Sequence, residues 1–293
     1  MPRALNALNA VALRVLAVLP LSVVALIASW PAGAAQPTLV ITAGEKSREY
    51  TAAALLSRKD TVSLTVPDDV SYRRPMTYRV VPLLALLGGV QDDRFDTLEA
   101  RATDGFVGQI PLALIAHGAD GGAVAWLAVE DPAHPWPPLP NHTTSAAPFY
   151  LVWEHSQRSD VRSEQWPYAL ASISLSESPV RRWPQLALPA NSSTDTAARS
   201  GQKVFFTMCL PCHQLNGGGG GKVGPDLGQP MSATQYLTEA GLRAIIRDPR
   251  AVRTWPDQHM AGFDRKTLPE PDLDALLAYL RAMADRSGAS SVK

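Results

Sequence analysis

Cys209-Leu210-Pro211-Cys212-His213 is the stretch that decides the fold of the C-terminal part of the chain. Two thiols at this spacing lie on one helical turn and reach the two vinyl groups of a porphyrin, and the adjacent imidazole then lies under the iron. A thioredoxin-like redox pair would need a βαβ pattern around it, and a zinc site would need a second cysteine pair. The sequence has neither, so the motif predicts one covalent haem c on Cys209 and Cys212, with His213 as an axial ligand of the iron.

Helical periodicity surrounds this motif on both sides. Before it, apolar or small residues recur at helical spacing after a possible N-cap at Thr194 or Asp195. A second helix is expected over Leu273–Met283, with Pro269 and Pro271 at its start, and a third over 236–247, closed by Asp248-Pro249. We therefore predict an all-α domain over residues 195–287, followed by a tail over 288–293.

Three methionines compete for the sixth coordination position of the iron, where a thioether raises the reduction potential. Met283 lies on the apolar stripe of the last helix, which favours core packing, and Met231 follows His213 closely. Met260 lies in a loop before the last helix, where the chain can cross the opposite haem face, so it is the predicted ligand. Its neighbour His259 is an alternative ligand, although a surface histidine is the simpler interpretation.

These residues resemble the class I c-type cytochromes over about residues 195–287. The resemblance rests on Gly201 and Phe205, the attachment motif, and the segments at 224–227, 260–263 and 276–280. It implies that Gly201 and Tyr279 meet where the first and last helices cross. It also implies that the carbonyl of Pro225 accepts a hydrogen bond from His213 and orients that axial ligand. The family often has proline after the axial methionine, whereas this chain has Ala261.

Two further features near the motif have simple explanations. The glycine run at 217–221 before Lys222 lacks the remaining residues of a phosphate-binding loop and is interpreted as a flexible loop beside the haem. Arg247, Arg253 and Trp255 have donors that suit haem propionates, but solvated side chains explain them equally well.

The N-terminus has the features of an export signal. Arg3 and Arg14 precede an apolar run, and Ala32-Gly33-Ala34 provides small residues for cleavage. We predict a signal peptide over residues 1–34 and a periplasmic location. An uncleaved anchor is the alternative, but Pro20 interrupts the run, which is shorter than the ~20 apolar residues that a bilayer requires. No later stretch is long and apolar enough to span a membrane.

Composition limits the remaining possibilities. A chain of 293 residues is long enough for about two domains of roughly 150 residues. Its 27 basic and 27 acidic residues leave no positive excess for a phosphate backbone, so nucleic acid is not an expected partner. Prolines and small polar residues follow Trp183, and we predict a linker over 186–194 that separates the all-α domain from a domain over 35–185.

The first domain is expected to be α+β and rich in β-structure. Its short β-prone runs predict strands at 38–42, 62–66, 76–81, 98–103, 124–129, 149–153 and 171–175, with brief helices at 50–57, 82–87 and 111–117. The segments at 66–69, 82–87, 102–106, 126–132 and 135–140 resemble the molybdopterin-binding domain of sulfite-oxidase-type oxidoreductases over about residues 38–180. That family binds molybdenum through a cysteine, and no cysteine precedes Cys209, so molybdopterin is not expected. His117, His134, His142 and His155 show no metal-binding spacing.

Three functions remain open at this level, and one of them treats the first domain as a ligand-binding sensor whose occupancy alters electron transfer. The other two are as follows. The first is an exported electron carrier that exchanges electrons with redox proteins, its N-terminal domain being a partner-docking or vestigial domain. The second is a haem-containing subunit or fusion of a sulfite-oxidase-like oxidoreductase. The sequence provides no catalytic residue for the second function, so the question of enzymatic activity stays open and the carrier is preferred.

Overall fold

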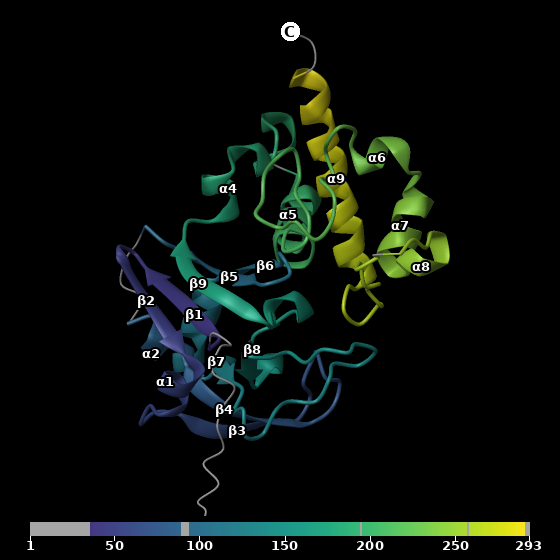
Figure 1. Cartoon of the computed structure of the whole chain (residues 1–293). Coiled ribbons are helices and arrows are strands. Elements are labelled where there is room, and N and C mark those ends of the chain that lie inside the picture. Colours follow the sequence, from purple (N-terminus) through teal and green to yellow (C-terminus); the bar gives the residue numbers. More distant parts are fainter. Residues whose placement is uncertain (1–35, 89–93, 194, 257, 291–293) are drawn as a thin grey trace, which may run out of the picture. The chain divides into compact units, whose positions relative to one another are not determined.

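The structure is a computed structural model that describes residues 36–88, 94–193, 195–256 and 258–290. The predicted signal peptide over 1–34 lies outside the described residues. No helix within the described ranges is long and apolar enough to cross a membrane. The predicted fold class is confirmed: a β-rich region with two sheets is followed, from residue 196, by helices (Figure 1). The exact domain boundaries stay a prediction.

The first sheet has five strands in the order β2-β1-β9-β5-β6. All neighbours are antiparallel except β1 and β9, which run parallel. The strands are β1 (Thr38–Ala43), β2 (Lys46–Thr51), β5 (Thr97–Ala102), β6 (Val107–Pro111) and β9 (Leu170–Ser176). Strands β2 and β6 therefore form the two edges of this sheet, and β6 matters for the site described below.

The second sheet has four strands in the antiparallel order β3-β4-β7-β8. They are β3 (Val62–Val66), β4 (Met76–Pro82), β7 (Val124–Val129) and β8 (Phe149–Glu154). Short helices follow strands, as expected: α1 (Ala52–Leu56), α2 (Leu83–Leu86) and α3 (Leu112–Ala116). Residues from both sheets and these helices form one apolar core.

That core contains a buried polar cluster around Asp69. The Asp69 carboxylate accepts hydrogen bonds from the Tyr72 amide at 2.7 Å and from the Tyr78 and Tyr150 hydroxyls at 2.8 and 3.3 Å. Trp136 packs edge-on against Tyr78 with ring centroids 5.1 Å apart, so the proline-rich segment at 134–140 is anchored in the core. Burial raises the pKa of Asp69, and the hydrogen bonds that it accepts oppose the rise.

Two strands were not predicted. Strand β2 is charged and largely exposed, and it forms because Gly44, with φ of 62°, turns the chain back onto β1. Strand β6 contains Gly108 and Gln109, which weaken its apolar alternation. Gln109 is nevertheless buried, because its amide donates to the carboxylate of Glu99 on the paired strand at 3.1 Å.

The C-terminal region is helical throughout its regular elements. It consists of α5 (Thr196–Met208), α6 (Ala233–Tyr236), α7 (Glu239–Arg247), α8 (Pro249–Val252) and α9 (Glu270–Ser290), and α4 (Pro179–Arg182) precedes it. Asp195 caps α5 by accepting from the amides of Ala197 and Ala198. The helix expected over 236–247 corresponds to α7, which begins at Glu239, because Leu237 is extended and Thr238 is the N-cap. Helix α6 precedes it and was not predicted.

Helices α5 and α9 are neighbours (Figure 1). They cross in close contact at Gly201. A Cβ on Gly201 would lie 1.8 Å from the carbonyl oxygen of Ala275 and 2.9 Å from the Cβ of Tyr279. The predicted meeting of Gly201 and Tyr279 is therefore confirmed. Phe205 packs against the Tyr279 ring at 5.4 Å, and Met283 is fully buried in the same core, as its position on the apolar stripe predicted.

The predicted linker is attached to this second core at its beginning. Leu186 is fully buried there. Its carbonyl accepts hydrogen bonds from the Tyr279 hydroxyl at 2.7 Å and from the Gln202 amide at 2.9 Å. Residue 186 therefore contributes to the helical region rather than serving only as a spacer.

Candidate haem-attachment site

The attachment motif begins where α5 ends. Cys209 is the C-cap of α5, and its carbonyl accepts from the amides of Cys212 and His213 at 3.1 and 2.9 Å. This tight turn keeps both half-buried thiols and the imidazole on one short segment. Both cysteines are free. Burial raises the pKa of both thiols, that of Cys212 to about 12, so they are neutral thiols in the protein without haem.

Two adjacent residues, Gly224 and Pro225, hold the His213 ring in place. Its Nδ1 lies 2.8 Å from the carbonyl oxygen of Pro225, the contact that the resemblance implies. Gly224 lies against the ring, where a Cβ would be 2.3 Å from Cε1. Burial lowers the pKa of His213, and the contact with Pro225 opposes this effect. The arrangement favours a neutral ring with its proton on Nδ1 and Nε2 free to bind a metal.

Asp226 organises the loop that carries Pro225. Its carboxylate accepts four main-chain hydrogen bonds of 2.6 to 3.1 Å, from the amides of Asn216, Gly217, Gly228 and Gln229. These bonds fold the loop back toward the motif and fix the segment that faces His213. Sequence reasoning quoted Asp226 only as part of a family segment, although Asp commonly bonds to nearby amides in loops.

Met260 lies in the segment between α8 and α9, half-buried against the second core. Arg247 anchors this segment, because its Nη1 donates to the carbonyls of Phe263, Asp264 and Leu268 at 3.0, 3.1 and 2.6 Å. Sequence reasoning considered Arg247 for the haem propionates and missed this role. His259 is exposed, which agrees with its interpretation as a surface histidine, and Met231 is 52% exposed.

The residues present fit a c-type haem. The donor set is two neighbouring thiols and an imidazole that the Pro225 carbonyl already orients. Gly224 lies against this imidazole ring, where any side chain would clash with it. The ligand role of Met260 and the orienting role of Pro225 stay predictions. Within the described ranges, no cluster of three or more His, Cys, Asp or Glu side chains forms another metal site. His117, His134, His142 and His155 are all exposed.

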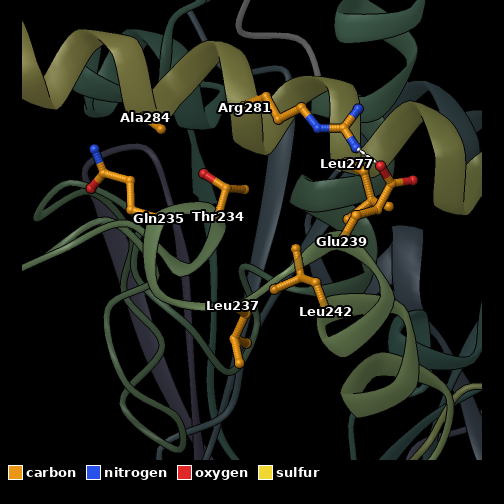
Figure 2. Close-up of a pocket in the computed structure, with 8 residues that line it drawn as sticks. All are labelled: Thr234, Gln235, Leu237, Glu239, Leu242, Leu277, Arg281 and Ala284. Atoms are coloured by element: carbon orange, nitrogen blue, oxygen red, sulfur yellow. Dashed lines mark hydrogen bonds and ion pairs between the residues drawn. The ribbon is translucent and has the colours of Figure 1, made fainter.

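A separate pocket of about 400 Å³ lies between α6, α7 and α9 (Figure 2). Leu237, Leu242 and Leu277 form its apolar part, and an ion pair between Glu239 and Arg281 closes one side. None of the attachment residues lines it. The pocket is therefore distinct from the candidate haem site.

Comparison with known proteins agrees with this site. Residues 198–284 match the family model described as cytochrome c, a match that covers less than a third of the chain. No curated protein matches the chain. The match does not extend to residues 38–180, so the resemblance of that region to molybdopterin-binding domains stays a prediction. The chain carries a cytochrome c domain at 198–284, which supports a haem-binding electron-transfer function.

Proposed function

We propose that this chain is an exported electron carrier with one haem c, whose iron has His213 and Met260 as axial ligands. The observation that carries the proposal is the 2.8 Å contact between His213 Nδ1 and the Pro225 carbonyl, directly beside the two thiols. A bound haem accepts and releases one electron at its iron. Two permanent ligands keep the coordination of the iron unchanged during that exchange, which suits a carrier.

The chain's own residues supply the positioning. Pro225 and Gly224 keep the imidazole in one orientation, and Asp226 keeps that loop in place. Arg247 ties the Met260 segment to α7 through three carbonyls, which limits the freedom of the loop in which Ala261 replaces the proline of the family pattern. A thioether ligand raises the reduction potential relative to nitrogen or thiolate ligands.

The proposed location and partners follow from the same features. The predicted signal peptide over 1–34 directs the chain to the periplasm. The donor and the acceptor are redox proteins, and the N-terminal region serves as a docking domain. Because no cysteine precedes Cys209, molybdopterin chemistry is not part of the proposal.

Met260→Ala tests the ligand assignment. The variant retains its covalent haem, because Cys209 and Cys212 are unchanged, but loses the thioether and binds carbon monoxide in the reduced state. Its midpoint potential falls by on the order of 100 mV, within the ~0.8 V that axial ligands span. The measurements are the absorbance spectrum and a redox titration.

Met231→Ala is the matched control, because this methionine is exposed and outside the second core. Its potential and spectrum match those of the wild type. A Met260→Ala potential equal to that of the wild type rejects the ligand assignment. A full-length exported protein without acid-stable haem rejects the proposed function itself.

A further inference from the structure

The edge strand β6 of the N-terminal region is bonded to the attachment motif. The amide of Val107 donates to the carbonyl of Pro211, inside the motif, at 2.8 Å. Two residues before Val107, in the connection between β5 and β6, the carbonyl of Gly105 accepts from the amide of Lys222 at 3.3 Å. The motif loop thus occupies main-chain groups that an edge strand would otherwise leave open.

An ion pair joins the same two regions at a second point. Arg162 Nη1 lies 2.9 Å from Asp272 at the start of α9, with the two side chains 27% and 29% exposed. Arg162 also pairs with Asp160 on its own segment, where the acidic side chain is 80% exposed. Arg162 therefore has one partner in each region, and the two contacts are separable by mutation.

Directly after Arg162, the short 3-10 helix Ser163–Gln165 packs against α5. Its position is fixed from within the N-terminal region, because Trp153 donates to the Gln165 carbonyl at 2.8 Å and Leu151 donates to the Pro167 carbonyl at 3.0 Å. Glu164 therefore lies on a segment that bonds to the N-terminal region and packs against α5.

Glu164 lies on the 3-10 helix that packs against α5, the helix that leads into the attachment motif. After burial, its negative charge is the next cause that raises the pKa of both motif thiols, Cys209 and Cys212. Its own polar contact is the Ser163 hydroxyl at 3.3 Å, and within the described ranges no ion pair compensates its charge. A half-buried carboxyl group without a cation is costly to retain, which indicates a role.

We propose that the N-terminal region contacts the attachment motif permanently within the same chain. Through this contact, the charge of Glu164 sets the midpoint potential of the haem. The inference rests on the proposed function, because it requires a haem at Cys209 and Cys212. A negative charge near the iron stabilises the oxidised state, so an ionised Glu164 lowers the potential. When a one-electron donor reduces the haem that the motif would hold, the pKa of Glu164 would rise, and near neutral pH part of the Glu164 population would take up a proton from solvent.

The groups around Glu164 determine how its charge varies with pH. After the end of α5 these are the thiols of Cys209 and Cys212, which no longer ionise once they are thioethers. Within α5, Arg199 and Lys203 lie more than one turn before the motif. Strand β6 has no ionisable side chain. Tyr168 and Asp104 are titratable groups that interact with Cys212, and His213 follows it directly. Burial raises the pKa of Glu164 to about 7, so its charge changes near neutrality.

The test is a redox titration of the full-length haem protein from pH 5 to pH 9. At pH 9 Glu164→Gln has a higher potential than the wild type, by roughly tenfold in the oxidised-to-reduced ratio, or about 59 mV for one electron. The two curves converge at pH 5, where Glu164 is protonated. Glu164→Asp keeps the charge and restores the pH dependence.

Glu49→Gln is the matched control, because Glu49 is on β2 at the opposite edge of the same sheet, and its curve follows the wild type. Hydrogen exchange tests the contact itself: Asp272→Asn accelerates exchange of the Val107 amide, whereas Asp160→Asn leaves it unchanged. A Glu164→Gln curve that superimposes on that of Glu49→Gln overturns the proposal while the haem remains in place. An unprotected Val107 amide in the wild type overturns the permanent contact.

Discussion

Replacing Gly201 with alanine tests the helix crossing on which the cytochrome c domain is built. The new Cβ would lie 1.8 Å from the Ala275 oxygen and 2.4 Å from the Ala275 carbonyl carbon, against 3.4 Å or more in an ordinary contact. Both obstacles are main-chain atoms, so no side-chain rotation relieves the clash and α9 must move. That movement also strains the bond between the Tyr279 hydroxyl and the Leu186 carbonyl.

The expected magnitude follows from two opposing effects. Overpacking of this kind costs about 1–3 kcal/mol, and a weakened hydrogen bond costs about 1 kcal/mol. Alanine recovers up to about 1 kcal/mol because glycine is a poor helix former. We therefore expect a net loss of roughly 1–3 kcal/mol in the free energy of unfolding, seen as a lower guanidinium midpoint at an unchanged slope.

Gly241→Ala provides the matched helical glycine. Its Cβ would meet only side chains, 3.3 Å from Thr238 Oγ1 and 3.9 Å from Leu237, so it is expected to be neutral or to stabilise by up to about 1 kcal/mol. The assay is denaturant unfolding of the full-length haem protein, followed by far-ultraviolet circular dichroism. A Gly201→Ala protein as stable as the wild type would refute the close crossing.

Two further substitutions test other parts of the structure. Gly224→Ala displaces the His213 ring, since the Cβ would lie 2.3 Å from Cε1, and the expected cost of about 1–3 kcal/mol is read by denaturation together with the spectral signature of axial ligation. Asp69→Asn removes a buried carboxyl group whose folded pKa is raised, so the native wild type binds more protons than its unfolded chain. Wild-type stability relative to this variant therefore falls as pH rises from the unfolded pKa, about 3.9, through the folded pKa, and pH-dependent denaturation measures the difference. A constant difference between the two proteins would contradict the burial of that carboxyl group.

Local signals predicted most of the fold. The strands at 62–66 and 124–129 have the predicted bounds, and Asp195 is one of the two caps expected for the first long helix. Strands β2 and β6 were missed because their pairing depends on neighbouring strands rather than on their own apolar alternation. The later start of α7 was missed because the two extended residues Leu237 and Thr238 interrupt an otherwise helical pattern.

Some residues of the candidate site were likewise predictable from the sequence, and others were not. The spacing within Cys209–His213 carries its own chemistry, so the attachment residues were accessible from sequence. Asp226 and Arg247 act through main-chain groups, and a main-chain partner leaves no residue-type signal at its own position. The position of Glu164 could not be predicted, because no sequence pattern relates a short segment of the N-terminal region to the end of a helix in the C-terminal region.

The contact between the two regions has a physical basis in what each leaves incomplete. A β6 edge presents unpaired main-chain amides, and a helix that ends at Cys209 is followed by carbonyls without helical partners. The bond from Val107 to Pro211 satisfies one group of each kind. In the described residues, this amide and this carbonyl bond to each other across the two regions. The sheet edge and the attachment motif therefore stabilise each other.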